Sequence, residues 1–131
     1  MTEEELCVRM DATGFMHNDY KAFVYYTKCD SRYATMGDNM HLKIEGTGTV
    51  VYSLNGKVVK TRNCLYIPAL RGPLYSLQAH WMNPGCEVFS SYDVGSFLFF
   101  PTFTLQIDDS RENLVGYQAL GFSYDGPINY V

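Results

Sequence analysis

The sequence lacks a concentrated basic stretch. Its ten lysine and arginine residues are scattered along 131 residues, and fourteen acidic residues give a formal net charge of −4. Proteins that bind nucleic acid concentrate positive charge on one face or along one element. The composition therefore excludes DNA and RNA from the expected partners.

Long apolar runs are missing as well. No stretch approaches the roughly 20 apolar residues that a membrane-spanning helix needs. The chain opens with Met-Thr-Glu-Glu-Glu-Leu, which is acidic where a secretory signal requires a basic segment followed by an apolar one. We expect a soluble, intracellular protein of the cytoplasm that has no membrane partner.

Metal-binding patterns are also missing from the sequence. The four cysteines include no Cys-x-x-Cys pair, and none of the three histidines, His17, His41 and His80, stands three or four residues from a cysteine or another histidine. Zinc sites typically use such spacings. We predict reduced, mostly buried thiols, no metal and no other cofactor. His80 is interpreted either as a polar-face residue or as a hydrogen-bonded partner within the fold.

Aromatic residues, in contrast, are plentiful. They make up 15% of the chain, with eleven tyrosines and eight phenylalanines. Aromatic side chains fit the half-buried surface of a strand, and tyrosine also suits a pocket for an apolar or planar ligand. Strand content accounts for most of these rings, and an aromatic ligand pocket is the alternative interpretation.

Strand signals dominate the chain. Leu6–Met10 alternates apolar and polar residues with a period of two, which is typical of a half-buried strand. The stretch from 40 to 68 combines such alternation with Asn55-Gly56, the strongest short hairpin signal. Further strands are predicted at Glu87–Ser90, Ser96–Phe100, Thr102–Ile107 and Leu114–Ala119.

One segment has helical spacing and predicts a helix over Pro73–Met82. Proline suits a first helical position, the apolar residues stand three and four apart, and Asn83-Pro84-Gly85 follows as a stop signal. We therefore expect an all-β fold with one short helix, arranged as a small closed or nearly closed antiparallel barrel. No repeat or linker interrupts the chain, so residues 1–131 are expected to form a single domain. The barrel would span about 6–120, with a C-terminal extension at 121–131.

Four motifs give the chain a resemblance to a known family. They are Met36-Gly37-Asp38-Asn39, the strand Ile44–Val51, the segment Cys64–Leu77 and the segment Gly85–Ser91. In this order and spacing they resemble the protease barrel of copia-type (Ty1/copia) retrotransposon polyproteins. The resemblance covers about residues 6–120. It implies a retropepsin-like, aspartic-protease fold, a flap that closes over the site, and a homodimer that builds the site from two copies.

The same resemblance places Asp11 at the position of the family's catalytic carboxylate, in a degenerate motif. Family members continue Asp-Ser-Gly-Ala-Thr, whereas Asp11 is followed directly by Ala12-Thr13. Aspartic proteases share one proton between two carboxylates about 3 Å apart, and the glycine lets two turns approach closely. Because this turn lacks both the bracing hydroxyl and the glycine, we predict that proteolysis is lost. The similar stretch Asp30–Thr35 is rejected because it runs directly into the flap motif.

Three functions remain open. The favoured one is a captured, non-proteolytic barrel that binds or transforms a small apolar molecule. Asp11 would act as a lone acid or base, for example in a cyclisation, isomerisation or dehydration of natural-product biosynthesis. The alternatives are a homodimeric aspartic protease of retrotransposon origin and a non-catalytic binding or scaffold module. The predicted substrate-binding residues are Thr13, Phe15, Met36, Gly37, Asp38 and Asn39.

Overall fold

The computed structural model describes residues 6–9, 12–36, 39–54, 56–91, 93–108, 113–114 and 117–119. Within these ranges strands predominate, and α1 (Leu77–Met82) is the single α-helix. The predicted all-β class with one short helix is therefore confirmed. In this part of the chain no helix is long and apolar enough to cross a membrane. The predicted extension at 121–131 lies outside the described residues.

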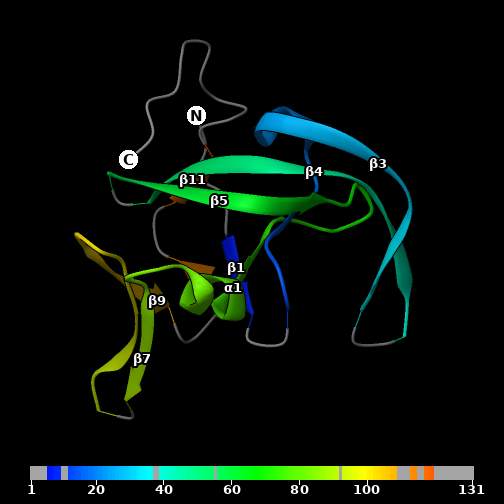
Figure 1. Cartoon of the computed structure of the whole chain (residues 1–131). Helices are drawn as coiled ribbons and strands as arrows, with labels where there is room; N and C mark the ends of the chain where they lie inside the picture. Colours follow the sequence, from blue (N-terminus) through cyan, green and yellow to red (C-terminus); the bar gives the residue numbers. More distant parts are fainter. Residues whose placement is uncertain are drawn as a thin grey trace.

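Three long strands form the layer that Figure 1 shows at the top, β3 (Phe23–Thr35), β4 (His41–Leu54) and β5 (Lys57–Tyr66). β4 pairs antiparallel with both β3 and β5. At the β4–β5 turn Leu54 lies opposite Lys57, and Gly56 has φ of 77°. Glycine adopts this positive φ without a steric penalty. The hairpin predicted at this position is confirmed.

Short strands below this layer bring distant segments of the chain together. β1 (Leu6–Arg9) runs parallel to β6 (Leu74–Ser76), and β2 (Met16–His17) runs parallel to β5. β2 also pairs antiparallel with β6. Parallel neighbours require a long crossover connection, and the β3–β4 hairpin lies within both crossovers. The sheet is thus mixed, whereas the sequence predicted only antiparallel pairing.

A three-stranded meander follows the helix, at the lower left of Figure 1. It consists of β7 (Glu87–Ser91), β8 (Gly95–Phe99) and β9 (Thr104–Asp108), all paired antiparallel. All three strands were predicted, with ends that differ by one or two residues. The single strand predicted at Leu114–Ala119 is replaced by two. β10 (Asn113–Leu114) pairs with β1 and β9, and β11 (Tyr117–Ala119) pairs with β4.

The strands follow the order β11-β4-β5-β2-β6-β1-β10-β9-β8-β7, with β3 attached to β4. Among the described residues the two ends of this order do not pair, so the sheet is not closed. The main core lies between the long strands and the short ones and includes Leu6, Val8, Val50, Tyr52, Leu54, Leu98 and Leu105. A smaller apolar cluster consists of Met16, Ile44 and Ile67.

The helix begins later than the sequence predicted. Leu74–Ser76 is strand β6, and Ser76 is the N-cap of α1 because its hydroxyl accepts a hydrogen bond from the Ala79 amide at 3.1 Å. An N-cap oxygen satisfies an amide that has no partner within the helix. Pro73 is therefore not the first helical residue, since pairing of the Leu74 region with β1 and β2 takes precedence over helical spacing. The helix ends at Met82, as predicted, and Asn83 is its C-cap.

Candidate functional site

The β3–β4 hairpin ends in a tight turn at the position of the predicted flap. Thr35 lies opposite His41, the Met36 amide donates to the carbonyl of Met40 at 2.8 Å, and the Asn39 amide donates to the carbonyl of Met36 at 3.0 Å. Asn39 has φ of 63°, a conformation that asparagine tolerates better than most residues. The predicted hairpin near Met36 is therefore present. Gly37 and Asp38 lie outside the described residues.

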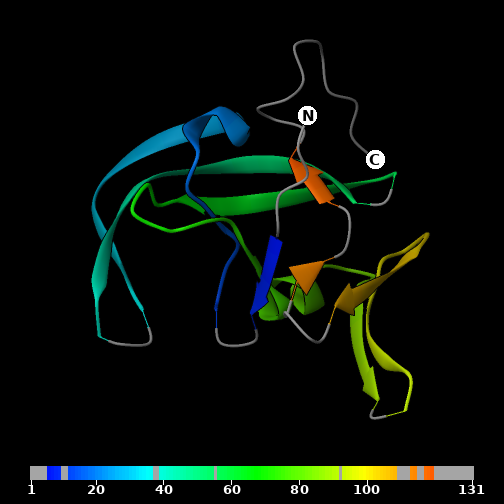
Figure 2. The same cartoon turned by 180° about the vertical axis from the view of Figure 1, so that it is seen from behind.

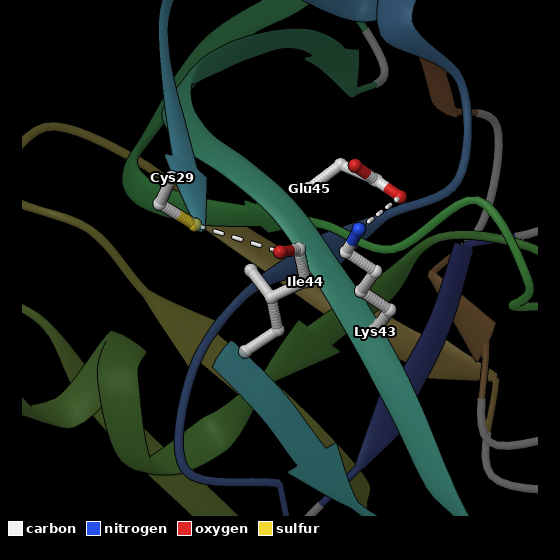
Figure 3. A network of polar contacts seen from close by, with 4 residues as sticks. All are labelled: Cys29, Lys43, Ile44 and Glu45. Atoms are coloured by element: carbon white, nitrogen blue, oxygen red, sulfur yellow. Dashed lines mark hydrogen bonds and ion pairs between the residues drawn. The ribbon is translucent and has the colours of Figure 1, made fainter. Parts of the chain in front are cut away.

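A bulge in β3 bends this hairpin. Lys28 lies opposite Gly46, but Arg32 lies opposite Ile44, so β3 has two residues more than β4 in this interval. Inside the bulge the Cys29 thiol donates to the carbonyl of Ile44 at 3.5 Å (Figure 3). Bulges bend a strand and increase its twist. The outer half of the hairpin, residues 32–36 and 39–44, consequently turns down and away from the upper layer (Figure 1), and we call it the flap.

The segment that follows β1 lies beside the flap. Figures 1 and 2 show from opposite sides that the described parts of the flap and of the connection from β1 to β2 both extend below the upper layer, and Ala12 and Thr13 line the same cleft as the flap residues Arg32 and Met36. Ser76 holds this connection, because its buried hydroxyl donates to the carbonyl of Ala12 at 2.6 Å while accepting from the Ala79 amide. One side chain thereby joins the connection to the start of α1. Asp11 itself lies outside the described residues.

A cleft of about 1160 Å³ lies between the flap and this connection. Thr13 and Met36, two of the predicted substrate-binding residues, line it. Phe15 does not, because its ring is buried and packs against Tyr75 with ring centroids 4.8 Å apart. Asn39 is exposed at the turn of the flap hairpin and is not among the lining residues.

The wall of the cleft has an apolar part and a basic part. The apolar side chains that belong to or pack against the smaller core cluster are Met16, Ala34, Ile44, Leu65, Leu70 and Leu74. The basic side chains are Arg9, Arg32 and Arg71. Tyr33 is the single aromatic among the described lining residues. The cleft is therefore apolar and basic in character, and most rings of the chain are located elsewhere.

Many of those rings form a cluster at the start of β3. Tyr20, Phe23, Tyr26 and Tyr66 contact one another with ring centroids 4.9 to 6.0 Å apart. The Tyr26 ring lies over Gly46, where a Cβ atom would overlap it. The aromatic content thus serves strand packing here, as expected from β-propensity.

No three His, Cys, Asp or Glu side chains in the described ranges are grouped as metal ligands. The cationic side chains of the cleft wall suit an anion instead, because a guanidinium donates hydrogen bonds and accepts none. The sequence offered no sign of this grouping, since Arg9, Arg32 and Arg71 are far apart along the chain. Ser76 was also missed as a positioning residue, although a serine ahead of a helical pattern is a usual N-cap signal.

His80 is fully buried between the helix and the meander. Its Nε2 lies 3.0 Å from the carbonyl oxygens of both Glu87 and Phe99, so it carries the proton and donates to them. Its Nδ1 then accepts from the Tyr75 hydroxyl at 2.8 Å. Burial lowers the pKa of His80, and the two carbonyl bonds act against this shift. The interpretation of His80 as a hydrogen-bonded partner is confirmed.

His17 is buried too, but one of its ring nitrogens has no partner. Nδ1 accepts from the backbone amide of Asp19 at 3.0 Å, so the neutral ring carries its proton on Nε2. Nε2 is buried without a hydrogen-bond partner, beside the rings of Phe23 and Tyr52. Burial lowers the pKa of His17 to about 4, although the Asp19 carboxylate raises it.

Comparison with known proteins gives one family. Residues 9–86 match the family described as "Pol polyprotein, beta-barrel domain". This range is more than half of the chain and extends from the end of β1, through the flap and α1, to the start of the meander. No curated protein and no solved structure matches the chain.

Proposed function

The chain belongs to the family of Pol polyprotein beta-barrel domains, and we propose that it is a non-proteolytic, retropepsin-like barrel whose cleft binds a small apolar molecule. The observation that carries this proposal is the cleft of about 1160 Å³ between the flap and the Ala12 segment, with an apolar wall that includes Met16, Ile44 and three leucines. Ligand pockets usually measure about 300 to 1,000 Å³ and are mostly apolar. The cleft is therefore large enough to hold a small molecule.

The residues that follow Asp11 support the non-proteolytic part of the proposal. Ala12 and Thr13 line the cleft, where a copia-type protease would have the serine and glycine of its catalytic turn. Ala12 has no hydroxyl to brace a pair of carboxylates. Thr13 has a Cβ atom where the close approach of two turns requires glycine. A retropepsin dyad is therefore not expected to form.

The proposal includes two finer expectations from the sequence. Asp11 precedes the cleft-lining Ala12 directly and is proposed as a lone acid or base for chemistry on the bound molecule. A homodimer is proposed as well. Trp81 and Met82 at the end of α1 are 72% and 84% exposed, and we propose that a second copy covers them, because large apolar side chains side by side on a surface favour association.

The binding proposal is tested with a cleft-blocking variant and a neutral fluorescent probe, N-phenylnaphthylamine. A Cβ atom at Gly72 meets no atom within 4 Å, and Gly72 lines the cleft. Gly72→Trp therefore places an indole at the cleft without a backbone conflict. Gly14→Trp is the matched control, since a Cβ at Gly14 also has open space but Gly14 does not line the cleft.

We expect the probe to bind the wild type and Gly14→Trp, and to bind Gly72→Trp at least about tenfold more weakly. If the probe bound both tryptophan variants equally well, the cleft would not be its binding site. Peptide cleavage that disappears in Asp11→Asn would establish the protease alternative instead. If Asp11→Asn retained full biological activity, the non-catalytic binding or scaffold module would be the function to keep.

A further inference from the structure

The cleft concentrates positive charge in a protein whose net charge is negative. Three of the ten basic residues, Arg9, Arg32 and Arg71, line it, and no aspartate or glutamate is found among the lining residues that the structure describes. The formal net charge of the whole chain is −4. If the acidic and basic residues were distributed evenly over the protein surface, acidic side chains would be expected in the cleft wall as well. The part of the cleft wall that the structure describes is thus basic.

The three arginines come from separate parts of the fold. Arg9 ends β1 and pairs in register with Ser76 of β6, Arg32 lies on β3 opposite Ile44, and Arg71 follows β5 in the loop that leads to β6. Within the described residues neither Arg32 nor Arg71 forms an ion pair. A guanidinium group can donate paired hydrogen bonds to a carboxylate or phosphate.

The same cleft offers an apolar surface next to these charges. Leu65, Leu70 and Leu74 are half-buried members of the apolar wall, packed against the smaller core cluster. A ligand that covers them gains hydrophobic free energy in proportion to the apolar area that it removes from water. An inorganic anion would leave this surface exposed, and a neutral hydrocarbon would leave the arginines without a partner.

We infer that the cleft binds an amphipathic anion, a small molecule with an apolar body and a carboxylate or phosphate group held by Arg32 and Arg71. This inference rests on the proposed function, because it names the class of the molecule that occupies the same cleft. The anionic group would accept paired hydrogen bonds from guanidinium, the geometry that arginine provides best. The apolar body would lie on the leucine side chains.

The test compares three ligands with the same ten-carbon chain. Decanoate, decyl phosphate and decanol are titrated by calorimetry into the wild type, Arg32→Gln, Arg71→Gln and Arg62→Gln, below the micelle-forming concentrations. Arg62 is exposed on β5 and does not line the cleft, so Arg62→Gln makes the same change of charge away from the site. The ratio of anion affinity to decanol affinity is measured for each protein.

We expect the wild type to bind at least one anion about tenfold more tightly than decanol. Arg32→Gln and Arg71→Gln should each reduce this ratio about fivefold or more, whereas Arg62→Gln should leave it unchanged. Added salt should weaken the binding of the anion and leave that of decanol nearly constant, because ions screen exposed charges. Comparison of decanoate with decyl phosphate identifies the anionic group.

The results separate this inference from the proposal on which it rests. If decanol binds as tightly as both anions, the inference is overturned, while a cleft that binds the neutral probe remains. An equal loss in Arg62→Gln would also overturn it, since general charge would then explain the preference. If neither anion nor decanol binds, the inference fails, and the tryptophan variants with the neutral probe decide the proposed function independently.

Discussion

Protonation of His17 should weaken the fold, and this effect can be isolated from every other titration. The ring is 1% exposed, accepts the Asp19 amide through Nδ1, and has Nε2 buried without a partner. Protonation of Nδ1 would place its new N–H group against the backbone N–H group of Asp19, so that two donors face each other. It would also put a positive charge beside the Phe23 and Tyr52 rings. The Asp19 carboxylate offsets this penalty only in part.

The magnitude follows from the two pKa values of His17. Burial lowers the folded-state pKa to about 4, whereas the unfolded chain has the ordinary value of 6.5. Below pH 6.5 the unfolded chain therefore binds a proton that the folded protein does not, and stability is lost as the pH falls toward 4. Between about pH 8 and about pH 5 the loss from His17 alone is about 2 kcal/mol, and it approaches about 3 kcal/mol at lower pH.

The assay is urea unfolding followed by circular dichroism at about pH 8 and about pH 5. His17→Asn keeps an acceptor for the Asp19 amide but does not titrate. The readout is the change in unfolding free energy between the two pH values, so a constant destabilisation by the smaller side chain cancels. His80 and the carboxylates remain in both proteins, and their contributions cancel in the comparison.

We expect the wild type to lose about 2 kcal/mol more than His17→Asn over this interval. The control His41→Asn, which changes an exposed histidine of β4, should behave like the wild type. If the wild type and His17→Asn differ by less than about 0.5 kcal/mol, the buried neutral His17 described above does not exist in solution.

Three further outcomes are expected. Ser76→Ala removes both the N-cap of α1 and the hydrogen bond to the Ala12 carbonyl. Urea titrations should show that the unfolding free energy falls by about 2 kcal/mol. An unchanged unfolding free energy would show that this hydroxyl does not hold the connection from β1 to β2. Gly48→Ala places a Cβ atom against the backbone carbonyl of Tyr25 and should cost about 3 kcal/mol, while Gly72→Ala, with open space, should be nearly neutral in the same measurement. Sedimentation at micromolar concentration should show a homodimer, and a monomer alone would reject that part of the proposal.

Local signals in the sequence were sufficient for much of the strand layout. Alternation predicted β1, the Asn55-Gly56 pair predicted the β4–β5 hairpin, and Asn83-Pro84-Gly85 predicted the end of the helix. Each of these features depends on backbone preferences within a few residues. Three of the four motifs that resemble the copia-type barrel lie in the range that matches the Pol polyprotein family, residues 9–86, and the fourth, Gly85–Ser91, begins at its end.

The start of α1 was mispredicted because a distant segment determines it. Leu74 fits helical spacing, but its backbone pairs with β1 and β2 instead. The strand predicted at Leu114–Ala119 is divided for the same reason, since its two halves pair with different partners. Local propensity is a weak preference that such tertiary contacts override.

The sequence by itself determined the all-β class, the turns and the family resemblance, because these depend on patterns between near neighbours. Only the tertiary structure decided which residues form the cleft. The Ser76 hydroxyl reaches the Ala12 carbonyl across 64 positions of the chain, and parallel pairing of β1 with β6 places Arg9 on the same cleft as Arg71. The periodicity of the sequence does not reveal such pairings, because they form between distant segments that long crossover connections bring together around a common core.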